Sequence, residues 1–214
     1  MLIIFDCDGV LVDSEMIASR ELAAYLTNLG RPTLGEECRE NFTGLSIKAV
    51  GEKVAREWGL KTPDDFEASL RARDFEAFER DLVAIPGVEA VLDTLDQKGL
   101  PYCVASSGSP EKIRHSLTIT NLLERFNGNV FSAVQVVNGK PAPDLFLLAA
   151  QTMGAAPDEC VVIEDSPAGV AGAKAAGMRV LGFTGGSHCD PGHVAKLSQA
   201  DTVFDTMNAL PALL

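Results

Sequence analysis

The sequence has no hydrophobic run long enough to cross a bilayer and few basic residues for its length. Its apolar stretches fall well short of the roughly 18 residues that a transmembrane helix needs, and the run before Asp6 is too short for a signal peptide. Lys and Arg number 18 against 30 Asp and Glu, so the formal net charge is −12. Without a basic cluster, the chain offers no surface for phosphate backbones or anionic lipids. We therefore expect a cytoplasmic protein that binds neither nucleic acid nor membranes.

Cysteine is also sparse, and its spacing excludes two kinds of site. The five cysteines are odd in number and form no CxxC pair, which argues against a disulfide framework and against a zinc site of the usual spacing. Three of them lie in or beside apolar runs, where we expect buried thiols: Cys7, Cys103 and Cys160.

The first thirteen residues contain an apolar run that ends in two acids. Residues 2–5 read LIIF, and Asp6, Asp8 and Gly9 follow. A short apolar run that stops at a polar turn is typical of a buried parallel strand, and ligands bind beyond the carboxyl ends of such strands. Two partly desolvated carboxylates repel each other unless a counter-charge such as a divalent cation is present. The structural alternative is an Asp-rich turn, in which Asp-Gly is common.

The pattern of apolar residues changes once in the rest of the chain. Residues 14–83 show only helical periodicity, with Ser14 as a candidate N-cap, and helices then alternate with strands. We predict strands near 102–106, 130–133, 160–164, 179–183 and 202–204, and helices at 110–117, 143–153 and 167–176. The predicted fold is an α/β doubly wound, mostly parallel Rossmann-like sheet formed by residues 1–13 and 84–214. Residues 14–83 form a helical cap inserted after the first strand, where it can act as a lid.

Two polar segments follow predicted strands or precede predicted helices. The turn that contains Ser106 and Ser107 opens a helix at Pro110, so its hydroxyls and backbone N–H groups can hold an oxyanion. Simple N-capping by Ser109 is the alternative. Lys140 stands between Gly139 and Pro141 in a stiff loop, which indicates a lysine aimed at a site, although a solvated surface lysine is the usual role.

A second apolar run, residues 160–163, ends in Glu164 and Asp165. If this strand is a neighbour of the first, these acids approach Asp6 and Asp8 and form an oxygen-only site suited to Mg²⁺. Capping of the following helix is the alternative.

Four motifs occur in order along the chain: DCDGVLVDSE, VASSGS, GKPAPDLF and VIEDSPAGVAGAKAAGM. Together they resemble the haloacid dehalogenase-like hydrolases, in the helically capped branch of phosphoglycolate phosphatases and β-phosphoglucomutases. The resemblance implies that Asp6 is a nucleophile that becomes an aspartyl phosphate, and that Asp8 is the general acid and base. It further implies that Ser106 and Lys140 hold the transferring phosphoryl group.

The implied Mg²⁺ ligands are Asp6, the Asp8 carbonyl, Glu164 and Asp165. In the family that the chain resembles, the dehalogenating branch lacks the second aspartate. The presence of Asp8 therefore favours phosphate chemistry. The implied function is a Mg²⁺-dependent phosphatase for small phosphorylated metabolites, with sugar or sugar-acid phosphates favoured, in a monomer or weak homodimer.

Two other functions stay open. A β-phosphoglucomutase-like phosphate transfer is one, although the places of that group's cap arginine and histidine hold Ile47 and Ala18. A receiver-like signalling domain is the other, and it would lack both the insert and a counterpart of Asp8. Candidate substrate-binding residues are Ser107 and, in the cap loop, Gly44, Ser46 and Lys48.

The segment that contains His188, Cys189 and His193 is polar and rich in glycine. We considered a second metal site there, but the spacing fits no strong zinc pattern. We expect a flexible loop at the rim of the site.

Overall fold

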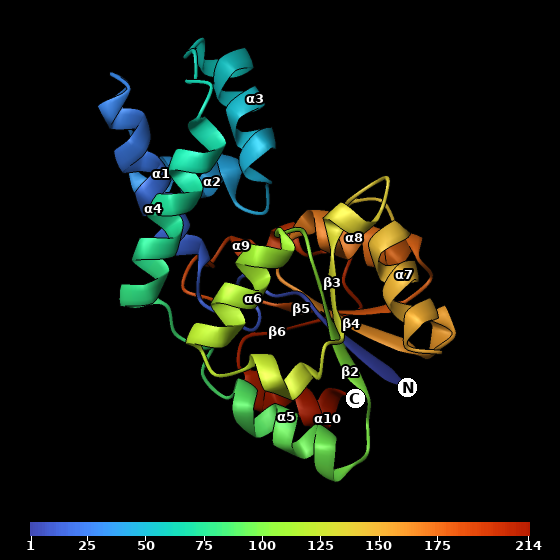
Figure 1. The fold of residues 1–214 in the computed structure, drawn as a ribbon. Coiled ribbons are helices and arrows are strands. Elements are labelled where there is room, and N and C mark those ends of the chain that lie inside the picture. The colour runs from blue at the N-terminus through green and yellow to red at the C-terminus, as the bar shows by residue number, and fades with distance from the viewer. The chain divides into compact units, whose positions relative to one another are not determined.

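The structure is a computed structural model that describes all 214 residues and divides into two compact units. One unit combines Met1–Asp13 with Val83–Leu214, and the other is the continuous segment Ser14–Leu82. The first strand therefore shares a unit with the last two-thirds of the chain, so the second unit is an insertion in sequence. Figure 1 shows each unit as a ribbon.

The larger unit contains a six-stranded sheet of the order β3-β2-β1-β4-β5-β6, and every pairing is parallel. The prediction of a doubly wound parallel sheet is confirmed. The first strand is central and fully buried, which explains its unbroken apolar sequence. The strands are β1 Leu2–Phe5, β2 Tyr102–Ser106, β3 Val130–Ser132, β4 Cys160–Glu164, β5 Arg179–Phe183 and β6 Thr202–Phe204.

Helices cover both faces of this sheet, with α7 and α8 on one side and α5 and α6 on the other (Figure 1). Leu145, Phe146 and Ala149 of α7 pack in one buried cluster with Leu2 and Ile4 of β1. The helices are α5 Val88–Gln97, α6 Pro110–Ile119, α7 Asp144–Thr152, α8 Pro167–Ala175, α9 His193–Lys196 and α10 Leu210–Leu213. Four short 3-10 helices complete the unit: η1 Leu123–Phe126, η2 Ala133–Gln135, η3 Pro157–Glu159 and η4 Met207–Ala209.

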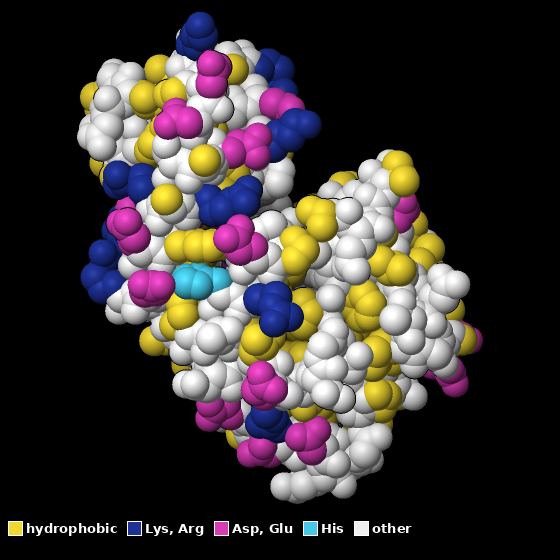
Figure 2. Space-filling view, viewed as in Figure 1, with side chains coloured by type: hydrophobic (Ala, Val, Ile, Leu, Met, Phe, Trp, Pro, Cys, Tyr) yellow, Lys and Arg dark blue, Asp and Glu magenta, His cyan; other side chains and the backbone are white.

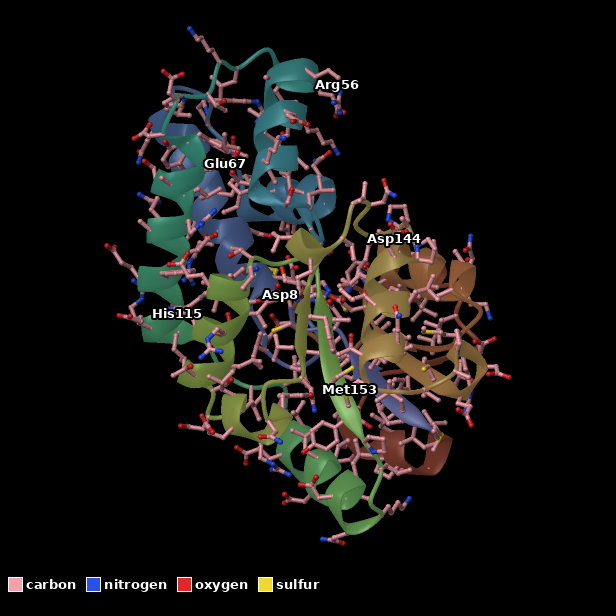
Figure 3. All side chains as sticks on the ribbon, turned by 45° about the vertical axis from the view of Figure 1, so that its right-hand side comes forward. Asp8, Arg56, Glu67, His115, Asp144 and Met153 are labelled. Carbon is pink, nitrogen blue, oxygen red and sulfur yellow. The ribbon has the colours of Figure 1, made fainter.

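The connecting helices run back from the carboxyl edge of the sheet. In Figure 3, Asp144 at the start of α7 lies toward the same end of the unit as Asp8, and Met153 after α7 lies toward the other end. The predicted helices at 110–117, 143–153 and 167–176 are confirmed. The short α9 and α10 were missed, because four residues are too few to show a period.

The inserted unit consists of α1 Glu15–Asn28, α2 Gly35–Phe42, α3 Ile47–Trp58 and α4 Phe66–Asp81. It has its own core, to which Leu26, Phe42, Val54 and Leu70 contribute. Ser14 stands directly before α1 but makes no capping hydrogen bond with its side chain. The sequence did not predict α2, in which only Cys38 and Phe42 are buried. No helix in the structure is apolar over a length that would span a bilayer.

Candidate active site

The strand order brings the two acid-bearing strand ends together. Phe5 of β1 pairs with Val104 of β2 on one side and with Ile163 of β4 on the other. The backbone N–H of Asp6 donates to the Ile163 carbonyl at 3.0 Å. Asp6 therefore lies beside Glu164, the residue that follows Ile163, at the carboxyl edge of the sheet.

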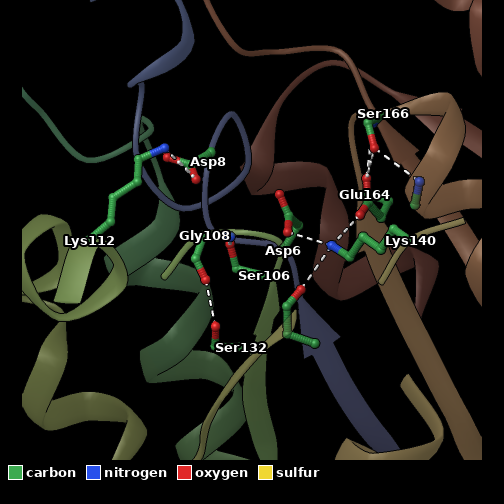
Figure 4. A network of polar contacts seen from close by, with 11 residues as sticks. Asp6, Asp8, Ser106, Gly108, Lys112, Ser132, Lys140, Glu164 and Ser166 are labelled. Atoms are coloured by element: carbon green, nitrogen blue, oxygen red, sulfur yellow. Dashed lines mark hydrogen bonds and ion pairs between the residues drawn. The ribbon is translucent and has the colours of Figure 1, made fainter. Parts of the chain in front are cut away.

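Lys140 reaches into this edge from the loop before α7 (Figure 4). Its Nζ lies 2.6 Å from Asp6 Oδ1 and 2.6 Å from Glu164 Oε1, and it donates to the Ala105 carbonyl at 2.9 Å. Only 4% of the lysine side chain is exposed. Burying an ammonium group is costly unless carboxylates and hydrogen bonds surround it, as they do here. The structure therefore places Lys140 as a bridge between two strand ends.

Glu164 is held on both of its oxygens. Oε1 accepts from Lys140, and Oε2 accepts from the backbone N–H and the hydroxyl of Ser166, each at 2.9 Å. Helix α8 starts so close to this carboxylate that a Cβ on Gly169 would lie 1.7 Å from Oε1. A glycine is required there because any side chain would displace the Glu164 carboxylate.

The site carries more negative than positive charge. Burial raises the pKa of Asp6 well above its usual value, while Lys140 acts in the opposite direction. Burial alone would lower the pKa of Lys140, but Asp6 and Glu164 more than offset this and raise it. Burial also raises the pKa of Asp165, and the neighbouring Glu164 carboxylate adds to that effect. Burial therefore disfavours the charged form of both carboxylates, and a nearby cation would favour it.

A metal ion would correct this imbalance. Asp6, Glu164 and Asp165 are all buried, and one oxygen of each lies within 4.8 Å of the others. When ionised, these three carboxylates exceed the single ammonium of Lys140 by two negative charges, which one divalent cation would neutralise. An oxygen-only donor set fits a hard cation such as Mg²⁺ rather than a soft one. This buried acidic cluster could bind a metal ion.

Asp8 lies near enough to this cluster to raise the pKa of Asp6 and Asp165, and it has a cation of its own. Its Oδ2 is 2.9 Å from Nζ of Lys112 on the first turn of α6, and both side chains are largely buried. The sequence reasoning missed Lys112. Its position could have indicated a role in the site, because it lies three residues after Ser109 in a helix that begins at the Ser-rich turn.

The turn after Asp8 depends on Gly9. This residue has φ +77°, and a Cβ there would lie 2.1 Å from Asp165 Oδ2. Gly9 therefore lets the first acidic loop approach the second one closely.

Ser106 ends β2 and is 1% exposed. Its hydroxyl accepts from the Gly108 backbone N–H at 3.1 Å, and Ser132 of β3 donates to the Gly108 carbonyl at 2.6 Å (Figure 4). Ser109 accepts from the backbone N–H of Lys112 at 3.2 Å, as expected of an N-cap. Hydrogen bonds of Gly108 with both Ser106 and Ser132 therefore hold this turn, which also contains the half-buried Ser107.

Residues 185–193 form a loop up to the start of α9, as predicted, and its two histidines are buried. His188 and His193 are 2% and 5% exposed, and both contact Asp165. His188 Nε2 lies 2.9 Å from Asp165 Oδ2, and His193 Nε2 lies 2.6 Å from the Asp165 carbonyl oxygen. A Cβ on Gly186 would lie 2.8 Å from the His188 ring, so the glycines in this segment let it fold back onto the acids.

The same segment also contacts the first motif. Ser187 donates to Asp13 Oδ1 with its backbone N–H at 3.0 Å and with its hydroxyl at 2.8 Å. The segment therefore connects the loop after β1 with the acid after β4.

The three other candidate residues belong to the inserted unit, and all three are exposed. Gly44 turns the chain between α2 and α3 with φ +79°. The Ser46 hydroxyl accepts from the Ala49 backbone N–H at 3.2 Å and caps α3, on whose first turn Lys48 lies. Ser46 thus has a structural role, and substrate binding by these residues stays a prediction.

Comparisons with known proteins agree with this geometry. A family model described as a haloacid dehalogenase-like hydrolase matches residues 1–177. The 6-phosphogluconate phosphatase of Escherichia coli (strain K12) is 32% identical over 212 residues, which cover 99% of this chain and 93% of that protein.

Two solved structures are similar along nearly their whole length. A conserved haloacid dehalogenase-like protein of unknown function from Agrobacterium tumefaciens str. C58 is 40% identical with a TM-score of 0.87, covering 99% of this chain and 96% of that one. A HAD family hydrolase from Deinococcus radiodurans R1, solved with bound phosphate and sodium, is 31% identical with a TM-score of 0.80, covering 99% and 93%.

Proposed function

The chain belongs to the haloacid dehalogenase-like hydrolases, and from this premise we propose that it is a Mg²⁺-dependent phosphatase of small phosphorylated metabolites. The observation that carries the proposal is the Asp6–Lys140–Glu164 bridge beside Asp165, with its excess of two negative charges. Phosphoryl transfer needs positioning and charge neutralisation, and this arrangement supplies both once a divalent cation binds.

Asp6 acts as the nucleophile. Its carboxylate oxygen forms a bond to phosphorus as the bond from phosphorus to the ester oxygen breaks, which leaves an aspartyl phosphate. Asp8 gives its proton to the leaving alkoxide and then takes one from the water that attacks phosphorus, so that inorganic phosphate departs and Asp6 is restored. Lys112, 2.9 Å from Asp8, holds the carboxylate of this acid and base in place.

Positive charge and hydrogen-bond donors orient the phosphoryl group. Lys140 and Ser106 hold its oxygens, and Glu164 in turn fixes Lys140. The residues that would hold Mg²⁺ are Asp6, the Asp8 carbonyl, Glu164 and Asp165, and the bound cation would offset the repulsion between a carboxylate nucleophile and a phosphate dianion.

The substrates are sugar or sugar-acid phosphates. The name of the 6-phosphogluconate phosphatase that is similar along 99% of the chain supports this class. Gly44, Ser46 and Lys48 of the inserted unit, and Ser107 of the larger unit, are the candidates for recognition of the non-reacting part of the substrate. A mutase would need other cap residues than Ile47 and Ala18, so we favour hydrolysis over phosphate transfer between sugar positions.

A panel of phosphate esters, assayed with Mg²⁺ and then with a chelator, tests the proposal. We expect release of inorganic phosphate from sugar or sugar-acid phosphates, its loss on chelation, and its loss in Asp6→Asn. An enzyme that isomerises hexose phosphates only with a hexose bisphosphate present would be a mutase instead. No turnover of any ester, with Asp6→Asn indistinguishable from the wild type, would reject an enzymatic role.

A further inference from the structure

The loop after β5 brings two imidazoles and a thiol together next to the acidic cluster. We propose that His188, Cys189 and His193 form a second cation site, which takes Zn²⁺ or another borderline divalent transition metal. The site is distinct in its donor atoms from the oxygen-only cluster of Asp6, Glu164 and Asp165.

The three side chains already lie at near-ligand distances. One possible ligand atom of each lies within 4.8 Å of the other two. Cys189 Sγ is 3.3 Å from His188 Nε2 and 4.0 Å from Nδ1, and the two imidazole rings are 5.2 Å apart and almost perpendicular. Ligand atoms of a tetrahedral zinc site with bonds of about 2.0–2.3 Å lie about 3.3–3.7 Å apart. Binding a metal would thus require the three ligand atoms to move closer by at most about 1.5 Å on this upper bound.

Both imidazoles also have the outer contacts that metal-binding histidines need. His188 Nε2 lies 2.9 Å from the Asp165 carboxylate, and His193 Nε2 lies 2.6 Å from the Asp165 backbone carbonyl. A histidine that binds a metal through one nitrogen usually donates the N–H of the other to a carboxylate or carbonyl oxygen. A neutral imidazole that donates from Nε2 carries its lone pair on Nδ1. In the tautomer that donates from Nε2 to Asp165, the ligand atom of each histidine is Nδ1.

The donor set selects the kind of cation. Thiolate and imidazole ligands suit Zn²⁺ and its transition-metal neighbours, whereas Mg²⁺ prefers carboxylate, carbonyl and water oxygens. His188 and His193 are buried while Cys189 is half-buried, so the cation enters from the Cys189 side. On binding, a bond forms between the metal and Sγ as the thiol proton leaves to solvent, and water completes the coordination.

The site is coupled to the acidic cluster through Asp165, which both histidines contact. Filling it fixes the imidazoles and with them the Asp165 carboxylate. This coupling rests on the proposed function, whereas the existence of the site does not.

Cobalt absorption tests the site, because a thiolate ligand adds an intense near-ultraviolet charge-transfer band that oxygen ligands do not produce. Metal-free full-length protein is titrated with Co²⁺ in excess Mg²⁺, which occupies the oxygen-only cluster. We expect one equivalent of Co²⁺ to give this band together with tetrahedral visible bands, and Zn²⁺ to abolish both.

Matched variants identify the ligands. Cys189→Ser should abolish the charge-transfer band, and His193→Gln should weaken Co²⁺ binding at least about tenfold. Cys38→Ala in the inserted unit and His115→Gln on α6 (Figure 3) should behave as the wild type. Each variant is first compared with the wild type by circular dichroism, and Cys189→Ser decides the matter if His193→Gln does not fold. Absence of the band in the wild type, or a band that survives in Cys189→Ser, would reject the site whether or not the protein is a phosphatase.

Discussion

Both units carry exposed ion pairs, such as Lys174–Asp201 in the α/β unit, but the pairs that Lys140 makes in the α/β unit are buried. In the α/β unit, Lys140 and its partners Asp6 and Glu164 have side chains that are 4%, 11% and 0% exposed. In the helical unit, Arg20 and Asp81 pair with side chains that are 54% and 31% exposed. Figure 2 shows basic and acidic side chains interspersed over the visible face of the helical unit.

The difference in burial indicates that the two kinds of ion pair have different roles. Taking a charge out of water costs free energy that a single partner rarely repays, so buried ion pairs seldom exist for stability alone. Exposed pairs cost little, contribute little, and are screened by salt. We therefore interpret the buried pairs as part of the catalytic site and the exposed pairs as ordinary surface interactions. The following predictions test that contrast.

Lys140→Met should have the largest effect, on both activity and stability. It leaves Asp6 and Glu164 facing each other without the ammonium that bridges them, which should lower the free energy of unfolding by about 3–5 kcal/mol. It should also lower phosphatase turnover by about 10²–10³-fold or more. Urea unfolding and phosphate release measure the two effects. A variant that loses neither would show that the buried bridge is dispensable.

Asp8→Asn should separate chemistry from metal binding. Loss of the proton donor should reduce turnover by about 10²–10⁴-fold, while Mg²⁺ affinity should stay the same because the proposed ligand at this position is the backbone carbonyl. Turnover and Mg²⁺ titration are compared in the same preparation. Full activity would refute the acid and base role, and a lost Mg²⁺ affinity would refute the carbonyl assignment.

His188→Ala should affect the acidic cluster indirectly. Removing the imidazole 2.9 Å from Asp165 Oδ2 should weaken Mg²⁺ binding by about 10–100-fold, since outer contacts orient metal ligands. The measurement is the Mg²⁺ concentration that gives half-maximal turnover. Turnover at saturating Mg²⁺ should be unchanged. His115→Ala on α6 is the control. Equal behaviour of the two variants would mean that His188 does not orient Asp165.

Asp201→Asn should have a small, pH-dependent effect. The hydrogen bonds from Lys174 and from the Val180 backbone N–H lower the pKa of Asp201. The stabilisation is therefore present above the unfolded pKa of about 3.9 and disappears as the pH falls through the lower folded value. Since both side chains of the pair are more than one-third exposed, the difference between wild type and variant at pH 7 should stay below about 1 kcal/mol. Unfolding at several pH values measures it, and a difference that grows toward acid pH would contradict the sign.

Arg20→Met should have the smallest effect. Its partner Asp81 is exposed and also pairs with Arg80 at 3.0 Å, so the free energy of unfolding should not change measurably. Urea unfolding in low and high salt provides the test. A clear destabilisation at low salt would remove the contrast between buried and exposed ion pairs.

The candidate site could be predicted unevenly from the sequence. Asp6, Asp8, Glu164 and Asp165 were recognisable because each follows an apolar strand, a pattern that is local. Lys112 was missed because one lysine on a helical first turn looks like any solvated lysine, and only the fold brings it to Asp8. The contacts of the His188 segment were missed for a similar reason, since its glycines are typical of loops and its contact with Asp165 joins positions far apart in the chain.

The sequence by itself determined the strands, most helices, and the acids at the strand ends. These features depend on periodicity and turn chemistry within a few residues. Only the tertiary structure decided that β1 lies between β2 and β4, which sets Asp6 beside Glu164 and lets Lys140 bridge them. The tertiary structure also brings His188 and His193 into contact with Asp165. Such contacts depend on strand order and on packing between segments far apart in the chain, which no local pattern encodes.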